Sequence, residues 1–159
     1  MSLSFTSNSS IIKNGDLIAW QGTKFIDQVV RFFTRSTYSH VGMAFWKDNV
    51  LYVVEAVNPV VAMNPLAGRT EFYHVAMDVQ WKPEYETLLM SRLGKEYSIW
   101  HDIQAMFVKP KQDGEWECAM LDTIDYNLMG IPLTNLYTPD ALVKAAAEYS
   151  PTGINLFTE

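Results

Sequence analysis

The chain has 159 residues, of which 48% are hydrophobic and 19% are charged, and its formal net charge is −6 at pH 7. A chain of this size and composition is expected to form one domain with one packed core over residues 1–159. It has no lysine or arginine cluster and no apolar run near the ~20 residues that cross a bilayer. We therefore expect neither a nucleic-acid partner nor a transmembrane segment.

With one cysteine and three histidines, the chain is expected to form neither a disulfide framework nor a structural zinc site, and no cofactor is expected. Residues 1–10 are polar and are expected to be loosely ordered. They lack the positively charged start and the apolar stretch of a secretory leader. No leader is therefore expected, which favours the cytoplasm only by default.

Hydrophobic periodicity and turn residues predict helices and strands in alternation, typical of an α+β domain. In chain order, the expected elements are a strand ending at Trp20, a helix over 23–35, strands over 40–46 and 50–56 joined by the turn Lys47-Asp48-Asn49, a loop over 58–70, a strand over 71–79, a helix from Pro83 that stops at Gly94, a short helix over 98–108, a helix from Trp116 that stops at Gly130, and a last helix that opens at Thr138-Pro139 and runs to Glu148.

The hairpin over 40–56 carries two residues that are unusual in an apolar sheet. His40 stands at the start of its first strand and Glu55 near the end of its second strand. Antiparallel pairing brings these two positions to the same end of the hairpin. Histidine and glutamate are rarely buried in a sheet without partners, so the pair is a candidate for a polar site.

Cys118 is the only cysteine, and it is expected in the first turn of a helix, directly after a loop. The partial positive charge of a helix N-terminus stabilises a thiolate, and the free backbone N–H groups there can form an oxyanion hole. A thiolate nucleophile needs an imidazole to share its proton and a third polar group to orient that imidazole. His40 and Glu55 are the candidates for those two roles.

Simpler interpretations exist for each residue alone. Cys118 could be a small core residue, His40 a hydrogen-bonded residue at a strand end, and Glu55 a charge on an edge strand. The other histidines, His74 in a strand and His101 in a helical turn, are expected to be structural.

Asp122 and Asp125 lie three residues apart and resemble an acid/base pair, but they are expected to form a helix flank that faces water. The aromatic residues Trp20, Phe45 and Trp46 are expected in the core.

Four residues next to the candidate histidine and cysteine are expected to line a substrate pocket. They are Tyr38 and Ser39 before the first strand, and Trp116 and Glu117 before the cysteine.

Several segments in this order resemble the circularly permuted NlpC-type papain-like cysteine peptidases and amidases, the YiiX-like family. The resemblance covers most of the chain and is carried by Gly15-Asp16-Leu17-Ile18, Tyr38-Ser39-His40-Val41-Gly42-Met43, Val53-Val54-Glu55-Ala56, Cys118 at a helix start, and Thr138-Pro139-Asp140-Ala141-Leu142. One departure is that Ala119-Met120 follows the cysteine, where relatives usually carry Ser-Glu.

The resemblance implies an antiparallel, small barrel-like sheet packed against helices. It also implies that Cys118 is the nucleophile, His40 the general base and then acid, and Glu55 the residue that orients the imidazole. The expected reaction is hydrolysis of an amide in a small peptide, an acyl-amide or a cell-wall muropeptide through a thioester. Two alternatives stay open: a lipid acyltransferase or hydrolase of the lecithin-retinol acyltransferase-like branch, whose Asn-Cys-Glu-His signature this chain lacks, and an inactive binding module on the same scaffold.

Overall fold

The computed structural model describes residues 2–21, 37–57, 59–69, 71–96, 118–133 and 138–158, with the backbone alone described for 118–121. Its elements are β1 (Ser2–Ser4), α1 (Phe5–Asn8), a 3₁₀ turn (Ser9–Ile11), β2 (Leu17–Trp20), β3 (His40–Lys47), β4 (Val50–Val57), β5 (Val60–Pro65), β6 (Phe72–Val75), α3 (Pro83–Arg92), α5 (Cys118–Leu128), α6 (Pro139–Tyr149) and β7 (Ile154–Thr158).

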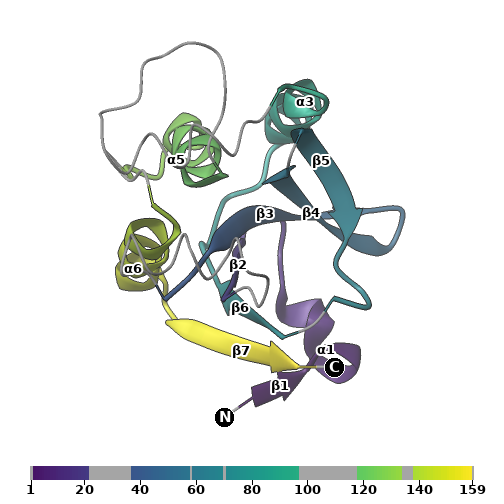
Figure 1. Ribbon diagram of the computed structural model, residues 1–159, viewed down its shortest axis with the longest axis vertical. Coiled ribbons are helices and arrows are strands. Elements are labelled where there is room, and N and C mark those ends of the chain that lie inside the picture. Colours follow the sequence, from purple (N-terminus) through teal and green to yellow (C-terminus); the bar gives the residue numbers. More distant parts are fainter. Residues whose placement is uncertain are drawn as a thin grey trace.

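One seven-stranded sheet organises the described part of the chain, in the order β1-β7-β6-β2-β3-β4-β5. All neighbouring strands are antiparallel except β1 and β7, which are parallel, and the two outer strands β1 and β5 leave the sheet open. In Figure 1, α5 and α6 lie along one side of the sheet, and α1 lies close to both chain ends. The α+β class is thereby confirmed, but the described strands form an open, mixed sheet and not the antiparallel, barrel-like sheet that the resemblance implies.

The β3–β4 hairpin forms where the sequence predicts it. Asp48 and Asn49 take positive φ angles of 50° and 61°, which is the backbone of the two-residue turn that matches strand twist. Lys47 and Val50 face each other across this turn, and Met43 pairs with Val54 farther along. This register places Glu55 opposite Gly42, two residues from His40.

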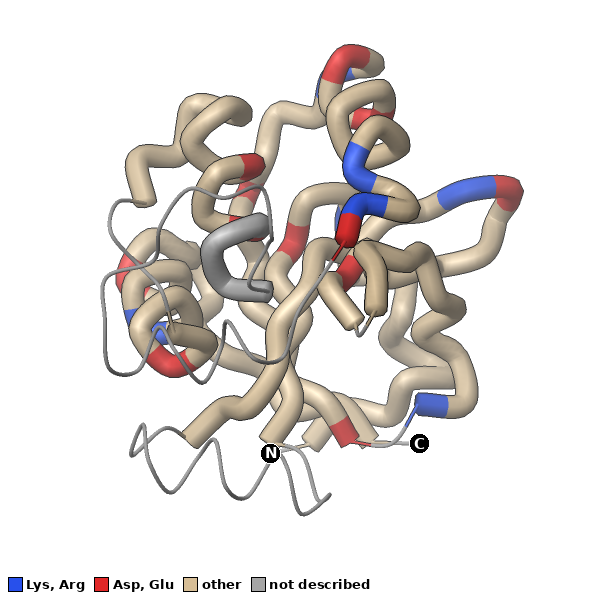
Figure 2. The backbone as a smooth tube through the Cα atoms, turned by 45° about the horizontal axis from the view of Figure 1, so that its top comes forward, with Lys and Arg blue, Asp and Glu red and all other residues tan. Residues whose placement is uncertain are grey.

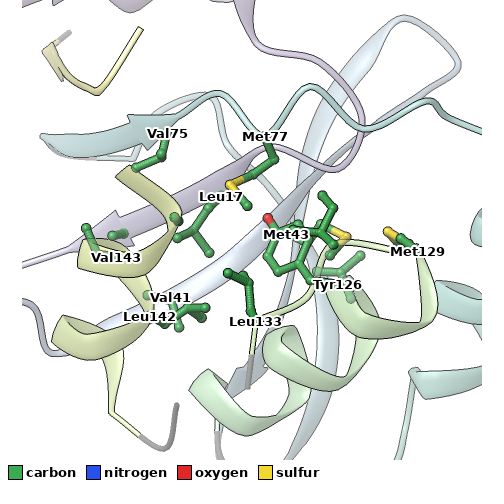
Figure 3. Packing of buried hydrophobic residues seen from close by; sticks show 14 of the residues in the cluster. Leu17, Val41, Met43, Val75, Met77, Tyr126, Met129, Leu133, Leu142 and Val143 are labelled. Atoms are coloured by element: carbon green, nitrogen blue, oxygen red, sulfur yellow. The ribbon is translucent and has the colours of Figure 1, made fainter. Parts of the chain in front are cut away.

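The two faces of the sheet form separate hydrophobic clusters, because side chains alternate along each strand. The helix-side cluster contains Val41 and Met43 of β3 together with residues of α5 and α6, and Figure 3 shows Tyr126, Leu142 and Val143 pointing at the strands. The opposite-face cluster is built from Ile12, Ile18, Trp20, Ala44, Leu51, Val53, Leu66, Phe72 and Phe157.

The predicted helix ends are confirmed where the structure describes them. Pro83 opens α3, and the Thr138 hydroxyl caps α6 by accepting a hydrogen bond from the Ala141 N–H at 3.3 Å. After α5, Gly130 takes a φ of 85° and Ile131 N–H donates to the Tyr126 carbonyl, the hydrogen bond typical of a glycine stop. The predicted helices over 23–35 and 98–108 lie outside the described residues.

Two expectations about irregular segments were wrong. The loop predicted over 58–70 contains β5, which pairs with β4 through Glu55 and Ala62, and its prolines are tolerated because β5 is an edge strand. The opening segment, expected to be loose, forms β1 and α1, and β1 pairs with β7. The strand predicted over 71–79 is limited to β6.

Charges of both signs are mixed along the described backbone. Figure 2 shows basic and acidic positions next to one another in α3 and in the β3–β4 turn. Among the described helices, none combines the length and apolar character needed to cross a membrane.

Candidate functional site

His40 is the first residue of β3 and its side chain is 21% exposed. Its strand neighbour is Trp20 of β2, and the two rings lie 5.5 Å apart with a 30° tilt. Both rings point to the opposite-face cluster, because Val41, the next residue of β3, faces the helices. The imidazole is thus held at a strand end with one side open.

Glu55 accepts a hydrogen bond from His40, with Nε2 and Oε2 2.7 Å apart, although the carboxylate is buried. Asn64 Nδ2 donates to Oε1 at 2.9 Å, and the guanidinium of Arg69 donates to both oxygens. Burial works to raise the pKa of Glu55, but the hydrogen bond and charge of His40, with the bonds from Arg69 and Asn64, lower it to about 2. The carboxylate is therefore ionised at neutral pH.

An ionised carboxylate only accepts hydrogen bonds, so the Nε2 atom of His40 carries the proton of this bond. Nδ1 is then the ring nitrogen that holds a lone pair when the imidazole is neutral. None of the hydrogen bonds found among the described residues uses Nδ1. The Glu55 pair therefore presents a basic nitrogen at the exposed end of β3.

Gly42 makes this pairing sterically feasible. A Cβ atom at this position would lie 2.6 Å from Val53 Cγ2 and 2.9 Å from both Glu55 Cβ and the Val54 carbonyl oxygen. Only glycine leaves room for β4 to approach β3 this closely beneath the Glu55 side chain.

The structure describes α5 from Cys118 onward, within the helix predicted from Trp116. The side chain of Cys118 lies outside the described residues, as do Trp116 and Glu117. The body of α5 packs on the helix side of the sheet, where Tyr126 contacts the cluster around Met43. The side chain of His40 leaves the other face of β3. A contact between Cys118 and His40 consequently requires the two to meet at the open end of β3.

The direction of α5 fits that requirement. Tyr126 donates its hydroxyl hydrogen to the Gly15 carbonyl at 2.8 Å, and Gly15 N–H bonds to Ala44 in the middle of β3. One turn earlier, Asp122 is buried, and the charge of Glu55 contributes to its raised pKa. A helical turn advances 5.4 Å, about the length of two strand residues, so the start of α5 points toward the His40 end of β3.

The two pocket candidates before β3 have different environments. Tyr38 is buried in the helix-side cluster, where its ring meets Tyr73 edge-on at 5.2 Å. Burial raises the pKa of its hydroxyl, and the neighbouring Tyr73 and Asp140 add to this effect. Ser39, which directly precedes His40, is half-buried, and its hydroxyl donates to the Trp20 carbonyl at 3.3 Å. Ser39 thus lies nearer to the imidazole pair.

His74 has the structural environment expected for it. It is buried in β6, and its Nε2 lies 2.8 Å from Asp16 Oδ2. Asp16 also accepts hydrogen bonds from the backbone N–H groups of Lys13 and Met77. The pair ties the turn before β2 to the segment after β6. His101 lies outside the described residues.

The expectation that Asp122 and Asp125 face water was wrong, because both are buried in α5. Asp125 is paired with Arg92 of α3, whose Nη2 lies 2.9 Å away, and its pKa is raised because burial outweighs the effect of Arg92. Burial also raises the pKa of Asp122 well above its ordinary value, with added effects from the charges of Asp125 and Glu55. Among the described residues, its Oδ2 has no hydrogen-bond partner. A buried carboxyl group with a raised pKa therefore lies one turn after Cys118.

Sequence reasoning missed Asn64 and Arg69, the other two partners of Glu55. Both lie in the segment expected to be a loop, and no periodicity marks either residue. Trp20 was expected in the core and is buried there, but it also covers His40. Within the described ranges, no group of three or more histidine, cysteine, aspartate or glutamate side chains is arranged to hold a metal ion.

No protein-family model matches the chain, and no curated protein matches it. Among solved structures, it resembles the crystal structure of YiiX from Escherichia coli O157:H7, which is described as a metalloprotein. The TM-score is 0.63 at 17% identity, and the match covers 91% of this chain and 96% of that chain. At this identity the likeness concerns the fold, and the chain has a YiiX-like α+β fold.

Proposed function

We propose that the protein is a cysteine hydrolase that cleaves an amide bond, with Cys118 as nucleophile, His40 as general base and acid, and Glu55 as the residue that orients His40. The observation that carries this proposal is the hydrogen bond of 2.7 Å between His40 Nε2 and buried, ionised Glu55. This hydrogen bond leaves Nδ1 at an exposed strand end, and a general base must be accessible to the group whose proton it takes.

In the proposed reaction, Nδ1 of His40 takes the thiol proton of Cys118 and the sulfur attacks the amide carbonyl carbon. The C–N bond then breaks, the imidazolium gives its proton to the leaving amine, and a thioester remains. Water, deprotonated by the same imidazole, attacks the thioester and releases a carboxylic acid and the free thiol. Glu55 stabilises the imidazolium in each half-reaction without taking its proton.

Two further observations support the assignment of Cys118. Cys118 is at the N-terminal end of the described part of α5, and at a helix N-terminus unpaired backbone N–H groups and the helix dipole favour a thiolate and an oxyanion. The start of α5 points toward the His40 end of β3, as argued from Tyr126 and Asp122. The substrate class proposed is a small peptide, an acyl-amide or a muropeptide.

The description of YiiX as a metalloprotein raises the question of whether Glu55 and His40 fit a metal ion. Both oxygens of Glu55 are occupied by Arg69, Asn64 and His40, and the Arg69 guanidinium already supplies a positive charge to this carboxylate. A cation at Glu55 would have to displace that guanidinium. The donor set does not fit a metal ion, and no step is assigned to one.

The reactivity of Cys118 provides the first test. Because the chain has one cysteine, alkylation by iodoacetamide reports on this residue alone. We expect the wild-type thiol to react at pH 6 at least tenfold faster than free cysteine, because a paired thiolate persists at that pH. The His40→Ala substitution should remove this advantage, and it should also abolish cleavage of a panel of fluorogenic peptide amides and muropeptides.

Lys47→Ala, at the exposed opposite end of the same strand, is the matched control and should behave like the wild type. A thiol that reacts like free cysteine at every pH, and equally in His40→Ala, would contradict the proposal and favour a binding module. Acylation by fatty-acyl thioesters without amide cleavage would assign the site to lipid acyl transfer instead.

A further inference from the structure

Four side chains on the opposite-face side of the sheet form a closed circuit of contacts. The Trp20 ring lies 5.5 Å from that of His40, and His40 bonds to Glu55. Glu55 is paired with both terminal nitrogens of Arg69, whose Cζ lies 5.3 Å from the centroid of the Trp20 ring. Each residue in this circuit touches two others, so none can turn without disturbing its neighbours.

Arg69 reaches this circuit from a tight turn after β5. Gly68 takes a φ of 74°, and the N–H of Arg69 bonds to the Leu66 carbonyl at 3.2 Å. The side chain is 29% exposed, and its guanidinium lies against Trp20 and Glu55. A guanidinium forms two parallel hydrogen bonds to a carboxylate, which fixes the plane of both groups.

We propose that Arg69 is a positioning residue for the His40–Glu55 pair, assisted by Asn64; this inference rests on the proposed function. Together, the two side chains occupy the acceptor positions of Glu55 that His40 does not use. The carboxylate therefore cannot rotate away from Nε2, and Nδ1 keeps its direction toward the open end of β3.

The charge of Arg69 adds a second effect. Glu55 is a buried anion, and a buried anion needs a cation close by. Arg69 supplies that cation permanently, so the charge balance of the pair does not depend on a proton on His40. The imidazole can then exchange protons with Cys118 while Glu55 stays ionised. Because both terminal nitrogens of Arg69 bind Glu55, we assign the guanidinium this role rather than binding of a substrate carboxylate.

The first experiment does not use the thiol. In a Cys118→Ser background, ¹⁵N NMR of the imidazole nitrogens should show His40 fixed as the Nε2–H form when neutral. Arg69→Met should produce a mixture of both tautomers, and Arg69→Lys, which keeps the charge but loses the paired geometry, should give an intermediate result.

The second experiment measures the pH dependence of Cys118 alkylation. In Arg69→Met, we expect a roughly 10- to 100-fold lower rate at neutral pH, the range for residues that orient a reacting group. The fall in alkylation rate on the acid side of the pH profile should also shift to higher pH, because Glu55 loses hydrogen bonds that lower its pKa. Arg92→Met removes a guanidinium–carboxylate pair elsewhere and is the matched control for lost stability.

The outcomes separate this inference from the proposed function. A tautomer that Arg69→Met leaves unchanged, or a pH profile that shifts equally in Arg92→Met, overturns the positioning role even if Cys118 is reactive. A tautomer lost only in the Arg69 variants supports it, even if Cys118 proves inert. Should Arg69→Met fail to fold, Arg69→Lys and Asn64→Ala give the same comparison.

Discussion

Two histidine–carboxylate pairs lie on the same face of the sheet, separated by strand β2. In each, Nε2 meets a carboxylate oxygen, at 2.7 Å for His40–Glu55 and 2.8 Å for His74–Asp16. The distances alone do not distinguish them. The His40 side chain is 21% exposed, whereas that of His74 is 2% exposed.

The remaining partners explain the difference between the two pairs. The other hydrogen bonds to the Asp16 carboxylate come from the backbone N–H groups of Lys13 and Met77. They connect segments that are far apart in the chain. The second nitrogen of His74 is buried and has no hydrogen-bond partner among the described residues, so it is not accessible to solvent or substrate. The other hydrogen bonds to the Glu55 carboxylate come from the side chains of Asn64 and Arg69, and the second nitrogen of His40 is at a strand end. We infer that the His74–Asp16 pair stabilises the fold, whereas the His40–Glu55 pair is the one available to the proposed reaction.

Removing the carboxylate of the buried pair should have the largest effect on stability. Asp16→Ala leaves two backbone N–H groups and His74 without their acceptor in the core. Breaking one partner of a buried polar network typically costs about 3–5 kcal/mol. We expect that loss in the free energy of unfolding, measured by urea denaturation followed by circular dichroism.

His40→Ala is the counterpart in the other pair. Glu55 keeps Arg69 and Asn64 in this variant, so the loss should be about 1 kcal/mol or less. Equal losses in Asp16→Ala and His40→Ala would show that the two pairs are both structural.

Glu55→Gln should lower stability in a way that depends on pH. The pKa of Glu55 falls from 4.5 to about 2 on folding, so ionisation contributes stability above pH 4.5 that is lost as the pH falls through about 2. A shift of this size corresponds to about 3 kcal/mol. The difference in unfolding free energy between wild type and variant should be largest at pH 7 and should vanish near pH 2. A difference that stays constant with pH would show that shape, not charge, holds this residue.

The parts of the fold that follow from local patterns could be predicted from the sequence. The β3–β4 hairpin depends on alternating residues and a short polar turn, and the ends of α3 and α6 depend on proline and Thr138. The predicted register of the β3–β4 hairpin places His40 and Glu55 at the same end of the hairpin, and in the structure the two side chains form a hydrogen bond. Elements that depend on local residue patterns, such as this hairpin and these helix ends, can therefore be predicted from the sequence.

The missed features depend on contacts between distant segments. β5 was not predicted because Pro59 precedes it and Pro65 ends it, and an edge strand tolerates proline at such positions. Asp125 looks like a solvated helix charge until Arg92, 33 residues away, supplies its partner. Arg69 lies 14 residues from Glu55 in a turn with no periodic pattern. No local signal reports such a partner.

Gly42 did carry a local signal, because a glycine inside a strand often marks a close backbone approach. A methyl group there would meet the Glu55 Cβ and the Val54 carbonyl at 2.9 Å. The backbone oxygen cannot move aside without shifting β4, so Gly42→Ala should cost about 1–3 kcal/mol, as overpacking does. It should also displace Glu55 from His40 while leaving the His74–Asp16 pair intact. In the imidazole NMR spectrum, the His40 signals should therefore change and those of His74 should not. Changes at both histidines would show that the two pairs belong to one cooperative unit, and that the His40–Glu55 pair cannot be altered independently of the His74–Asp16 pair.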